Sequence, residues 1–374
     1  MTVVAFGTAF IVADTMYRVY ARNTHGDRKD PRWNLYYHDD VLGANWHHTN
    51  STAILSWRAT APHRVSFNKF GCRGTSPITL QKPTNTVRII VLGGSSTENP
   101  FVGDGDTWPE KLEQKLNAAS EGVRVEVINL GAIGFTMARS VRNLELRGLM
   151  FNPDIVITYH AFNDFIQGFS RKYRARLNWQ ENYQDYEGRQ VSDLEGLLCK
   201  SAILDRLGRE WYYRRGRRRE EYLLRYWRAP VHANPAVEGV EDDFIQSLDA
   251  LKKMTDQHGC KLVVAIQANA VRSQPSRDLI TRDYDLFSNT LDGQCIDWDV
   301  YVRGFAHMRH AQIKFAELAG VDWIDVEARV SKDLEHFIDL VHLTDTGTEA
   351  VATVLGDALL RRGLVTHSDP GTRW

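Results

Sequence analysis

The fold of this chain is decided by one stretch, Val87-Arg-Ile-Ile-Val-Leu-Gly-Gly-Ser-Ser-Thr97. The stretch begins with a short β-branched run, and Gly93-Gly94 then allow the backbone to turn tightly. Helical spacing follows from Thr107 to Leu116. The sequence here therefore predicts a strand, a sharp turn and a helix. The turn would lie at the carboxyl end of the strand, which is where open α/β sheets bind ligands.

The same alternation of strands and helices continues along the rest of the chain. Short apolar runs alternate with segments that carry one apolar helical face. Strands are predicted at 87–92, 123–130, 154–158, 261–266 and 321–326, and helices at 107–116, 242–258, 302–318 and after 346. This order predicts an α/β class domain of three α/β/α layers around a central parallel sheet.

The predicted domain spans residues 87–365 and follows a leader at 30–86 that is irregular and contains short strands. Between about 165 and 240 the alternation stops, and charged and aromatic residues dominate, which predicts a helical insertion. The arginine-rich run 211–219 in this insertion favours a solvated helix face. A lid and a contact with a membrane surface are the alternatives.

The first 29 residues form a separate apolar segment. The run from Val3 to Ala13 is shorter than the roughly 20 apolar residues that a spanning helix needs. It has no charged region before it and no cleavage site of the signal-peptide type. Two interpretations carry equal weight, namely the remnant of a membrane anchor whose upstream part is missing and a helix packed on the domain.

Composition limits the classes of partner. The 46 basic and 47 acidic residues leave a net charge of −1, which creates no overall field for nucleic acid, and no nucleic-acid motif is present. We therefore expect no nucleic-acid partner. The four cysteines form no CxxC pair, and the adjacent His47-His48 lacks zinc-site spacing, so we expect no metal. The cysteines are Cys72, Cys199, Cys260 and Cys295.

Ser95 is the candidate nucleophile, because it lies in the turn after the first strand and before a helix. Ser96 is a weaker candidate for the same role. A phosphate could bind in such a turn, but the Lys of a P-loop and the full GxGxxG spacing are both absent. We therefore expect no nucleotide and no other cofactor.

The candidate base and its partner lie just before the final helix, in Phe337-Ile-Asp-Leu-Val-His-Leu-Thr344. The three-residue spacing of Asp339 and His342 suits a turn in which the carboxylate fixes the imidazole tautomer. A serine hydroxyl attacks poorly until such a base takes its proton. This loop follows the last strand, so we expect it to reach the same sheet edge as Ser95.

Donors for an oxyanion are expected in the loops after the second and third strands. The Gly134 N–H and the Asn163 side-chain amide could act beside the N–H of Ser95. Taken singly, Gly134 also fits a turn glycine and Asn163 a helix cap.

Together these four blocks resemble the SGNH (GDSL-like) hydrolase superfamily, which is named for the Ser, Gly, Asn and His found here at 95, 134, 163 and 342. The resemblance implies a flavodoxin-like fold. Two further segments, Asn68-Lys-Phe-Gly-Cys-Arg-Gly74 and Asp106-Thr-Trp-Pro109, resemble a bacterial subgroup that has an amino-terminal leader, often with a membrane anchor. Two positions differ from the usual pattern. Gly94 stands where the family usually has Asp, and Ala161 stands where it usually has Gly.

The sequence thus predicts a serine esterase that forms an acyl-enzyme at Ser95, with His342 and Asp339 completing the triad. The expected substrate is a short-chain acyl ester, with an O-acetylated carbohydrate preferred. The alternatives are an O-acyltransferase in polysaccharide modification, a thioesterase or lysophospholipase, and a non-catalytic binding module. A transferase would be expected to have a groove lined by aromatics such as Trp108, Trp211 and Trp227. A membrane-associated or exported location is favoured over a cytoplasmic one.

Overall fold

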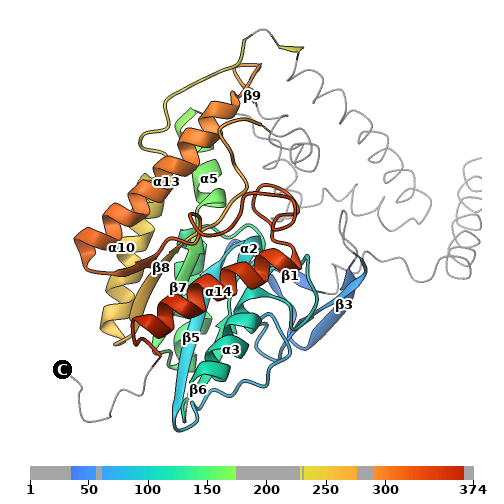
Figure 1. The fold of residues 1–374 in the computed structure, drawn as a ribbon, viewed down its shortest axis with the longest axis vertical. Coiled ribbons are helices and arrows are strands. Elements are labelled where there is room, and N and C mark those ends of the chain that lie inside the picture. Colours follow the sequence, from blue (N-terminus) through green and yellow to red (C-terminus); the bar gives the residue numbers. More distant parts are fainter. Residues whose placement is uncertain are drawn as a thin grey trace, which may run out of the picture.

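The computed structural model describes residues 35–55, 61–120, 122–173, 228–229, 231–275 and 290–365. Its centre is a five-stranded parallel sheet with the strand order β11-β8-β7-β5-β6 (Figure 1). Counted along the chain this is the 2-1-3-4-5 order of flavodoxin-like folds read from the other edge, so the predicted α/β class and parallel sheet are confirmed. The strands are β5 (Thr86–Gly93), β6 (Arg124–Asn129), β7 (Ile155–His160), β8 (Lys261–Ile266) and β11 (Asp322–Ile324).

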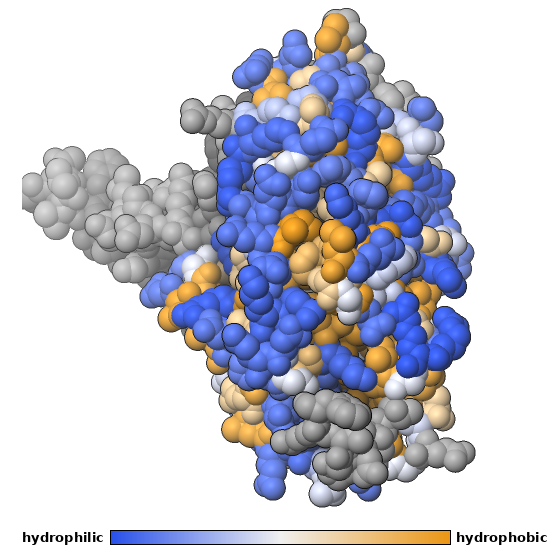
Figure 2. Space-filling view, turned by 90° about the vertical axis from the view of Figure 1, so that its left-hand side faces the viewer, coloured by the Kyte–Doolittle hydropathy of each residue, from blue (hydrophilic) through white to orange (hydrophobic). Residues whose placement is uncertain are grey.

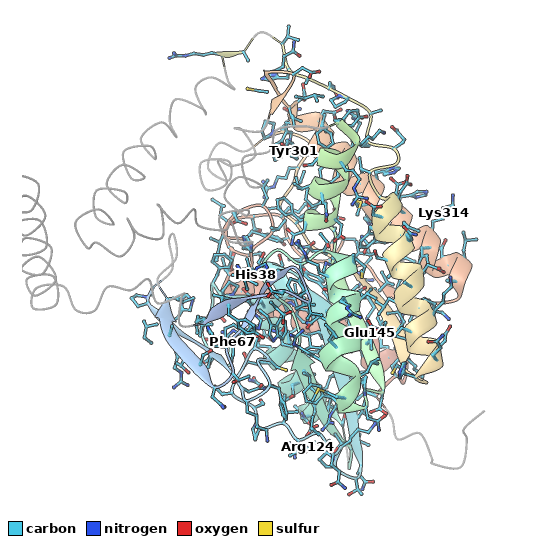
Figure 3. The ribbon with its side chains drawn as sticks, turned by 180° about the vertical axis from the view of Figure 1, so that it is seen from behind. His38, Phe67, Arg124, Glu145, Tyr301 and Lys314 are labelled. Atoms are coloured by element: carbon cyan, nitrogen blue, oxygen red, sulfur yellow. The ribbon has the colours of Figure 1, made fainter. Side chains whose placement is uncertain are left out.

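Helices cover both faces of this sheet, because its strands are apolar on both sides. On one face α3 (Trp108–Ala119) packs beside α14 (Asp345–Arg361). The other face, seen from behind in Figure 3, carries α4, α5 and α10, with α13 packed against α5, β8 and β11. Their bounds are α4 (Met137–Asn143), α5 (Phe162–Tyr173), α10 (Asp242–Gln257) and α13 (Trp298–Ala319). Two irregular helical turns, η2 (Leu144–Gly148) and η3 (Leu149–Phe151), continue α4.

Local sequence signals explain where several helices begin and end. Thr107 caps α3 by accepting from the Glu110 N–H, and the Glu110 carboxylate accepts in return from the Thr107 N–H. Thr344 caps α14 in a similar way, by accepting from the Gly347 N–H. Gly320 ends α13 in a left-handed conformation, at φ +63°.

The leader forms two antiparallel hairpins, one of which contacts Glu98, the last residue of α2 (Ser95–Glu98), through Tyr36 and His47. One hairpin pairs β1 (Tyr36–Asp39) with β2 (Ala44–His47), and the other pairs β3 (Ser51–Leu55) with β4 (His63–Phe67). The side chains of Trp46 and Cys72 are buried in the core of the domain itself. The short strands expected in the leader are therefore present, and part of the leader belongs to the main core. A further small hairpin joins β9 (Thr290–Leu291) to β10 (Gln294–Cys295).

Several predicted segments fall partly or wholly outside the described residues. These are the apolar segment 1–29 and most of the predicted insertion, including 211–219. Residues 165–173 of the predicted insertion belong to α5. Within the described ranges, no helix has the length and apolar character needed to cross a bilayer. The side of the molecule at the left of Figure 1 is mostly hydrophilic, with apolar side chains in small groups (Figure 2).

Candidate active site

Ser95 is the first residue of α2, which begins directly after β5 and the turn residue Gly94. Its Oγ therefore lies at the carboxyl edge of the sheet, as the sequence predicted for this turn. Gly94 has a steric reason to lack a side chain, because a Cβ there would lie 2.7 Å from Asn163 Nδ2 and 3.3 Å from the Phe135 carbonyl oxygen. This explains why glycine suits the position where the SGNH pattern usually has Asp.

The structure brings Ser95, His342 and Asp339 into one hydrogen-bonded line. The distance from Ser95 Oγ to His342 Nε2 is 2.7 Å, and the distance from His342 Nδ1 to Asp339 Oδ2 is also 2.7 Å. The other carboxylate oxygen of Asp339 accepts from the backbone N–H groups of Val341 and His342, at 3.1 and 2.9 Å. The three-residue spacing thus forms a tight turn in which one carboxylate holds both the backbone and the imidazole.

This arrangement fixes the tautomer of the imidazole. An ionised carboxylate can only accept hydrogen bonds, so the proton of neutral His342 lies on Nδ1, facing Asp339. His342 Nε2 then presents a lone pair to the Ser95 hydroxyl, which donates to it. These are the protonation states that a general base needs before it can take the serine proton.

Of the predicted oxyanion donors, Asn163 lines the same pocket as Ser95. Asn163, in the first turn of α5, donates from Nδ2 to the Phe135 carbonyl at 3.0 Å. Gly134 precedes Phe135 in the loop after β6, and its φ of +73° is a left-handed conformation that favours glycine. The Ser95 N–H is at the start of α2, where backbone donors have no partner within the helix.

A narrow pocket lies beside the Ser95 hydroxyl. Its volume is about 10 Å³, which is close to the space needed by the centre of one water molecule. Ser96 is part of its wall, and its Oγ donates to the Val341 carbonyl and accepts from Gln267 Nε2. Hydrogen bonding therefore links Ser95, and not Ser96, to the imidazole. The pocket is lined by Gly94, Ser95, Ser96, His160, Phe162, Asn163, Gln267 and Val341.

His160 precedes the unusual Ala161 and forms part of the same pocket wall. Its ring is buried, with Nε2 2.9 Å from Ser140 Oγ and Nδ1 3.4 Å from Asp164 Oδ2. Asp164 in turn accepts from the Met137 N–H at the start of α4. These contacts connect the loop that carries Gly134 to α5, the helix that carries Asn163. They restrain the pocket wall from both of these elements.

Sequence reasoning missed three residues that support the site. Gln267 follows β8 and closes the pocket, Phe101 packs against the His342 ring with centroids 4.3 Å apart, and Trp108 donates from Nε1 to the Ser96 carbonyl at 3.1 Å. Gln267 could have been suspected, because it follows a strand of the parallel sheet. Trp108 is fully buried, so it does not line the carbohydrate groove that a transferase was expected to have. Trp211 and Trp227 lie outside the described residues.

A second pair with the same spacing lies six residues earlier in the chain. Asp333 Oδ1 is 2.7 Å from His336 Nδ1 and accepts from the His336 N–H at 3.0 Å. The local geometry therefore resembles that of Asp339 and His342, yet the serine is hydrogen-bonded to His342. The spacing alone does not distinguish the two pairs, and their positions relative to Ser95 do.

The cysteines within the described ranges are poor candidates for chemistry. Cys72, Cys260 and Cys295 are free thiols and are buried. Burial raises the pKa of the Cys72 thiol to about 12 and that of the Cys260 thiol to about 11, so both stay protonated and weakly nucleophilic near neutrality. In the same ranges, no three His, Cys, Asp or Glu side chains are grouped so that they could hold a metal ion.

Comparison with known proteins gives structural likeness at low identity. No family model and no curated protein matches the chain. An acetyl xylan esterase is 14% identical over 73% of this chain and 100% of its own, with a TM-score of 0.42. A GDSL-like lipase from Bacteroides thetaiotaomicron is 10% identical over 76% and 93% of the two chains, with a TM-score of 0.40. A mutant of an acetyl-xylooligosaccharide esterase from Geobacillus is 14% identical over 77% and 97%, with a TM-score of 0.41.

Proposed function

We propose that this protein is a serine esterase that forms an acyl-enzyme at Ser95 and acts on acetyl esters. The observation that carries this proposal is the line from Ser95 Oγ through His342 to Asp339, with two distances of 2.7 Å, at the carboxyl edge of a parallel sheet. A nucleophile within hydrogen-bonding distance of a base, with that base oriented by a carboxylate, is the arrangement that nucleophilic acyl transfer requires.

The reaction takes place in two steps. In the first step His342 Nε2 takes the Ser95 proton as Oγ attacks the ester carbonyl, and the imidazolium then protonates the departing alcohol. In the second step His342 takes a proton from the water that attacks the acyl-serine. The bond between the acyl carbon and Oγ then breaks, His342 returns the proton to Oγ, and the free acid leaves. Asp339 stabilises the imidazolium in both steps, because its carboxylate faces the protonated Nδ1.

The negative oxygen that forms during each attack needs hydrogen-bond donors. The side-chain amide of Asn163 and the backbone N–H groups of Ser95 and Gly134 are the proposed donors. Asn163 Nδ2 already lies against Gly94, so it is next to the attacking serine in the free protein. Its bond to the Phe135 carbonyl holds the amide in place before substrate binds, and such preorganisation is what makes an oxyanion donor effective.

The size of the pocket beside Ser95 supports a short acyl group. A space of about 10 Å³, which holds the centre of about one water molecule, favours a methyl group over a long alkyl chain. The buried contacts of Ser96, Gln267 and His160 restrain the pocket walls, so the space does not enlarge freely. We therefore propose an acetyl group as the acyl part. A carbohydrate is the alcohol that we propose among those that the SGNH resemblance allows.

The test is hydrolysis of p-nitrophenyl esters from acetyl to octanoyl by the wild type and by Ser95→Ala, with Ser96→Ala as the neighbouring control. We expect turnover of the acetyl ester to exceed that of the butyryl ester at least tenfold, to vanish in Ser95→Ala and to remain measurable in Ser96→Ala. Mass spectrometry of quenched samples should find one acetyl group on the peptide that contains Ser95. Release of acetate from an acetylated xylo-oligosaccharide then tests whether the alcohol of the substrate is a carbohydrate.

Two results would count against the proposal. If the wild type neither turns over any ester nor becomes acylated, the chain is not an esterase of this type. If Ser95 is acylated by the acetyl ester but loses the acetyl group only when a sugar hydroxyl is supplied, and that hydroxyl becomes acetylated, hydrolysis is wrong and the O-acyltransferase alternative replaces it.

A further inference from the structure

One loop at the active site is held by the leader. This loop comprises residues 99–106 and connects α2, which begins with Ser95, to the cap of α3. Phe101 in this loop is buried and lies against the ring of His342, with centroids 4.3 Å apart and planes inclined by 47°. The position of this loop therefore bears directly on the imidazole.

The leader binds the carbonyl groups of the residues on either side of Phe101. His63 in β4 approaches the Pro100 carbonyl with Nε2 at 2.8 Å. Arg73, which follows β4, donates from Nη2 to the Val102 carbonyl at 3.1 Å. Phe101 is thus fixed from both sides by side chains that lie earlier in the sequence.

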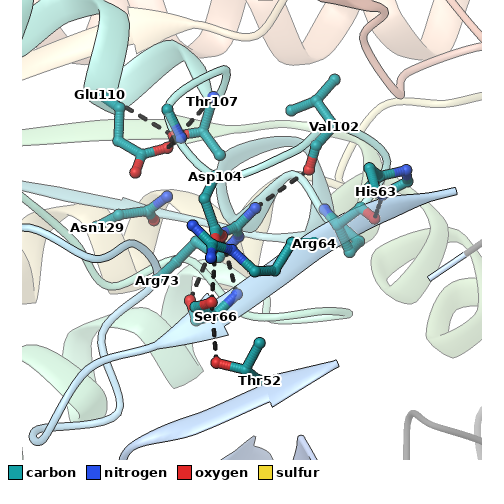
Figure 4. Close-up of polar contacts among 12 residues, drawn as sticks. Thr52, His63, Arg64, Ser66, Arg73, Val102, Asp104, Thr107, Glu110 and Asn129 are labelled. Atoms are coloured by element: carbon teal, nitrogen blue, oxygen red, sulfur yellow. Dashed lines mark hydrogen bonds and ion pairs between the residues drawn. The ribbon is translucent and has the colours of Figure 1, made fainter. Parts of the chain in front are cut away.

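A buried ion pair completes this attachment (Figure 4). Asp104 Oδ1 is paired with Arg73 Nη1 and accepts from the Ser66 N–H at 2.9 Å, while Oδ2 accepts from Ser66 Oγ at 2.6 Å and from Arg64 Nε at 2.9 Å. The Arg73 side chain is 0% exposed and that of Asp104 is 4% exposed. The Arg73 N–H also donates to the Asn129 carbonyl at the end of β6, at 3.2 Å, so the cluster is attached to the sheet itself.

We propose that Arg73, His63 and Asp104 are positioning residues for catalysis, which act by holding Phe101 against the imidazole of His342. The leader is then part of the catalytic unit and not an appendage of the hydrolase domain. Phe101 covers one face of the ring and restricts its rotation, which keeps Nε2 directed at Ser95. This inference rests on the proposed triad chemistry.

A second buried ion pair provides a matched control. Arg88 in β5 pairs with Glu126 in β6 through Nε at 2.9 Å and Nη2 at 2.6 Å. Its side chain is 0% exposed and that of Glu126 is 6% exposed, so the pair is as buried as that of Arg73 and Asp104. It lies near the amino ends of the strands, at the opposite edge of the sheet from Ser95. A purely structural role would make the two arginines equivalent.

The experiment compares Arg73→Lys with Arg88→Lys, each alone and combined with Phe101→Leu, in acetyl-ester hydrolysis at a temperature where circular dichroism shows every variant to be folded. Loss of positioning by about 1 Å can cost on the order of 100-fold in rate. We expect Arg73→Lys to lower kcat between about 10- and 100-fold with little change in KM, and Arg88→Lys to leave kcat within about twofold of the wild type. Arg73→Lys and Phe101→Leu should combine less than additively, because both act on the same contact. His63→Gln, at a partly exposed position, serves if Arg73→Lys does not fold, with a smaller loss of kcat expected.

The proposal is overturned if Arg73→Lys, or His63→Gln in its place, retains the kcat of the Arg88→Lys control, or if its effect adds fully to that of Phe101→Leu. Failure of the esterase assignment looks different, because the wild type itself would then be inactive and would not become acylated at Ser95.

Discussion

Replacing Asp339 with Asn should leave the fold intact and remove the base. In the wild type one carboxylate oxygen accepts from two backbone N–H groups and the other faces His342 Nδ1. An amide has a single acceptor oxygen, so it can satisfy only one of these two sides. Turning that oxygen toward the imidazole would leave two buried N–H groups facing an NH₂ group, at a cost of about 2 to 6 kcal/mol. The oxygen should therefore stay with the backbone.

The NH₂ group of the new amide would then donate to His342 Nδ1, which forces the imidazole proton onto Nε2. Ser95 would face an N–H group and lose its proton acceptor, while every distance in the site stays nearly the same. In a serine protease with the same three groups, such a change of tautomer lowers kcat about 10⁴-fold, which is about 5 kcal/mol of barrier. We expect Asp339→Asn to lower the rate of acetylation at Ser95 by about 10³- to 10⁴-fold.

The assay is the rate at which p-nitrophenol is released in the first turnover, measured by stopped flow with enzyme in excess over the ester. Asp333→Asn is the control, because that carboxylate holds His336 with the same spacing and the same backbone contact. It should change the acetylation rate less than threefold. A loss of less than tenfold in Asp339→Asn, or equal losses in both variants, would refute the tautomer argument.

Three further outcomes follow from the geometry. Gly94→Ala should place a Cβ 2.7 Å from Asn163 Nδ2 and displace this oxyanion donor. We expect kcat to fall about 100- to 1,000-fold while the circular dichroism spectrum stays unchanged. A fully active variant would contradict the role of Asn163. Gln267→Ala removes a side chain that closes the acyl pocket and should raise the butyryl-to-acetyl ratio of kcat/KM at least tenfold, and an unchanged ratio would show that the acyl group binds elsewhere. Burial raises the pKa of the Asp104 carboxyl, but the ion pair with Arg73 and the hydrogen bonds from Ser66 and Arg64 outweigh this effect and hold the pKa below its usual 3.8. The ionised carboxylate therefore stabilises the fold above pH 3.8. This stabilisation is lost as the pH falls through the pKa of the folded state. Urea unfolding should accordingly find Asp104→Asn less stable than the wild type at neutral pH, with the difference shrinking below pH 3.8; a constant difference would contradict the linkage.

The sheet could be predicted from the sequence because each strand has its own local signal. The runs at 87–92 and 261–266 are apolar, β-branched and bounded by turn residues, and they coincide with β5 and β8 to within one residue. The grouping of residues around Ser95 could also be predicted from the sequence, because parallel strands place the turns that follow them at one edge of the sheet. These predictions required only local patterns and one rule of topology.

The contribution of the leader could not be predicted in this way. Arg73 and Asp104 are separated by 31 residues, and neither lies in a periodic segment, so nothing local indicates that they pair. The same holds for His47, which is fully buried with its Nε2 3.3 Å from Glu98 Oε2. A histidine followed by another histidine suggests a polar surface, whereas this one has Nδ1 2.8 Å from the Gly71 carbonyl and a ring stacked on Phe67. Contacts of this kind exist only after the chain has folded.

The sheet order explains why the site needs so many separate segments. β5 lies between β6 and β7, so the turns after these three strands are neighbours, and they carry Ser95, Gly134 and Asn163. The next strand, β8, is followed by Gln267, whose amide reaches the pocket wall. The base comes from farther away, because β11 is the opposite edge strand, and the segment from β11 to α14 must return across the sheet edge to bring His342 to Ser95. A base supplied by so long a connection depends on its surroundings for its orientation. That dependence gives a physical reason for a contact such as that of Phe101, and hence for a leader that holds Phe101 in place.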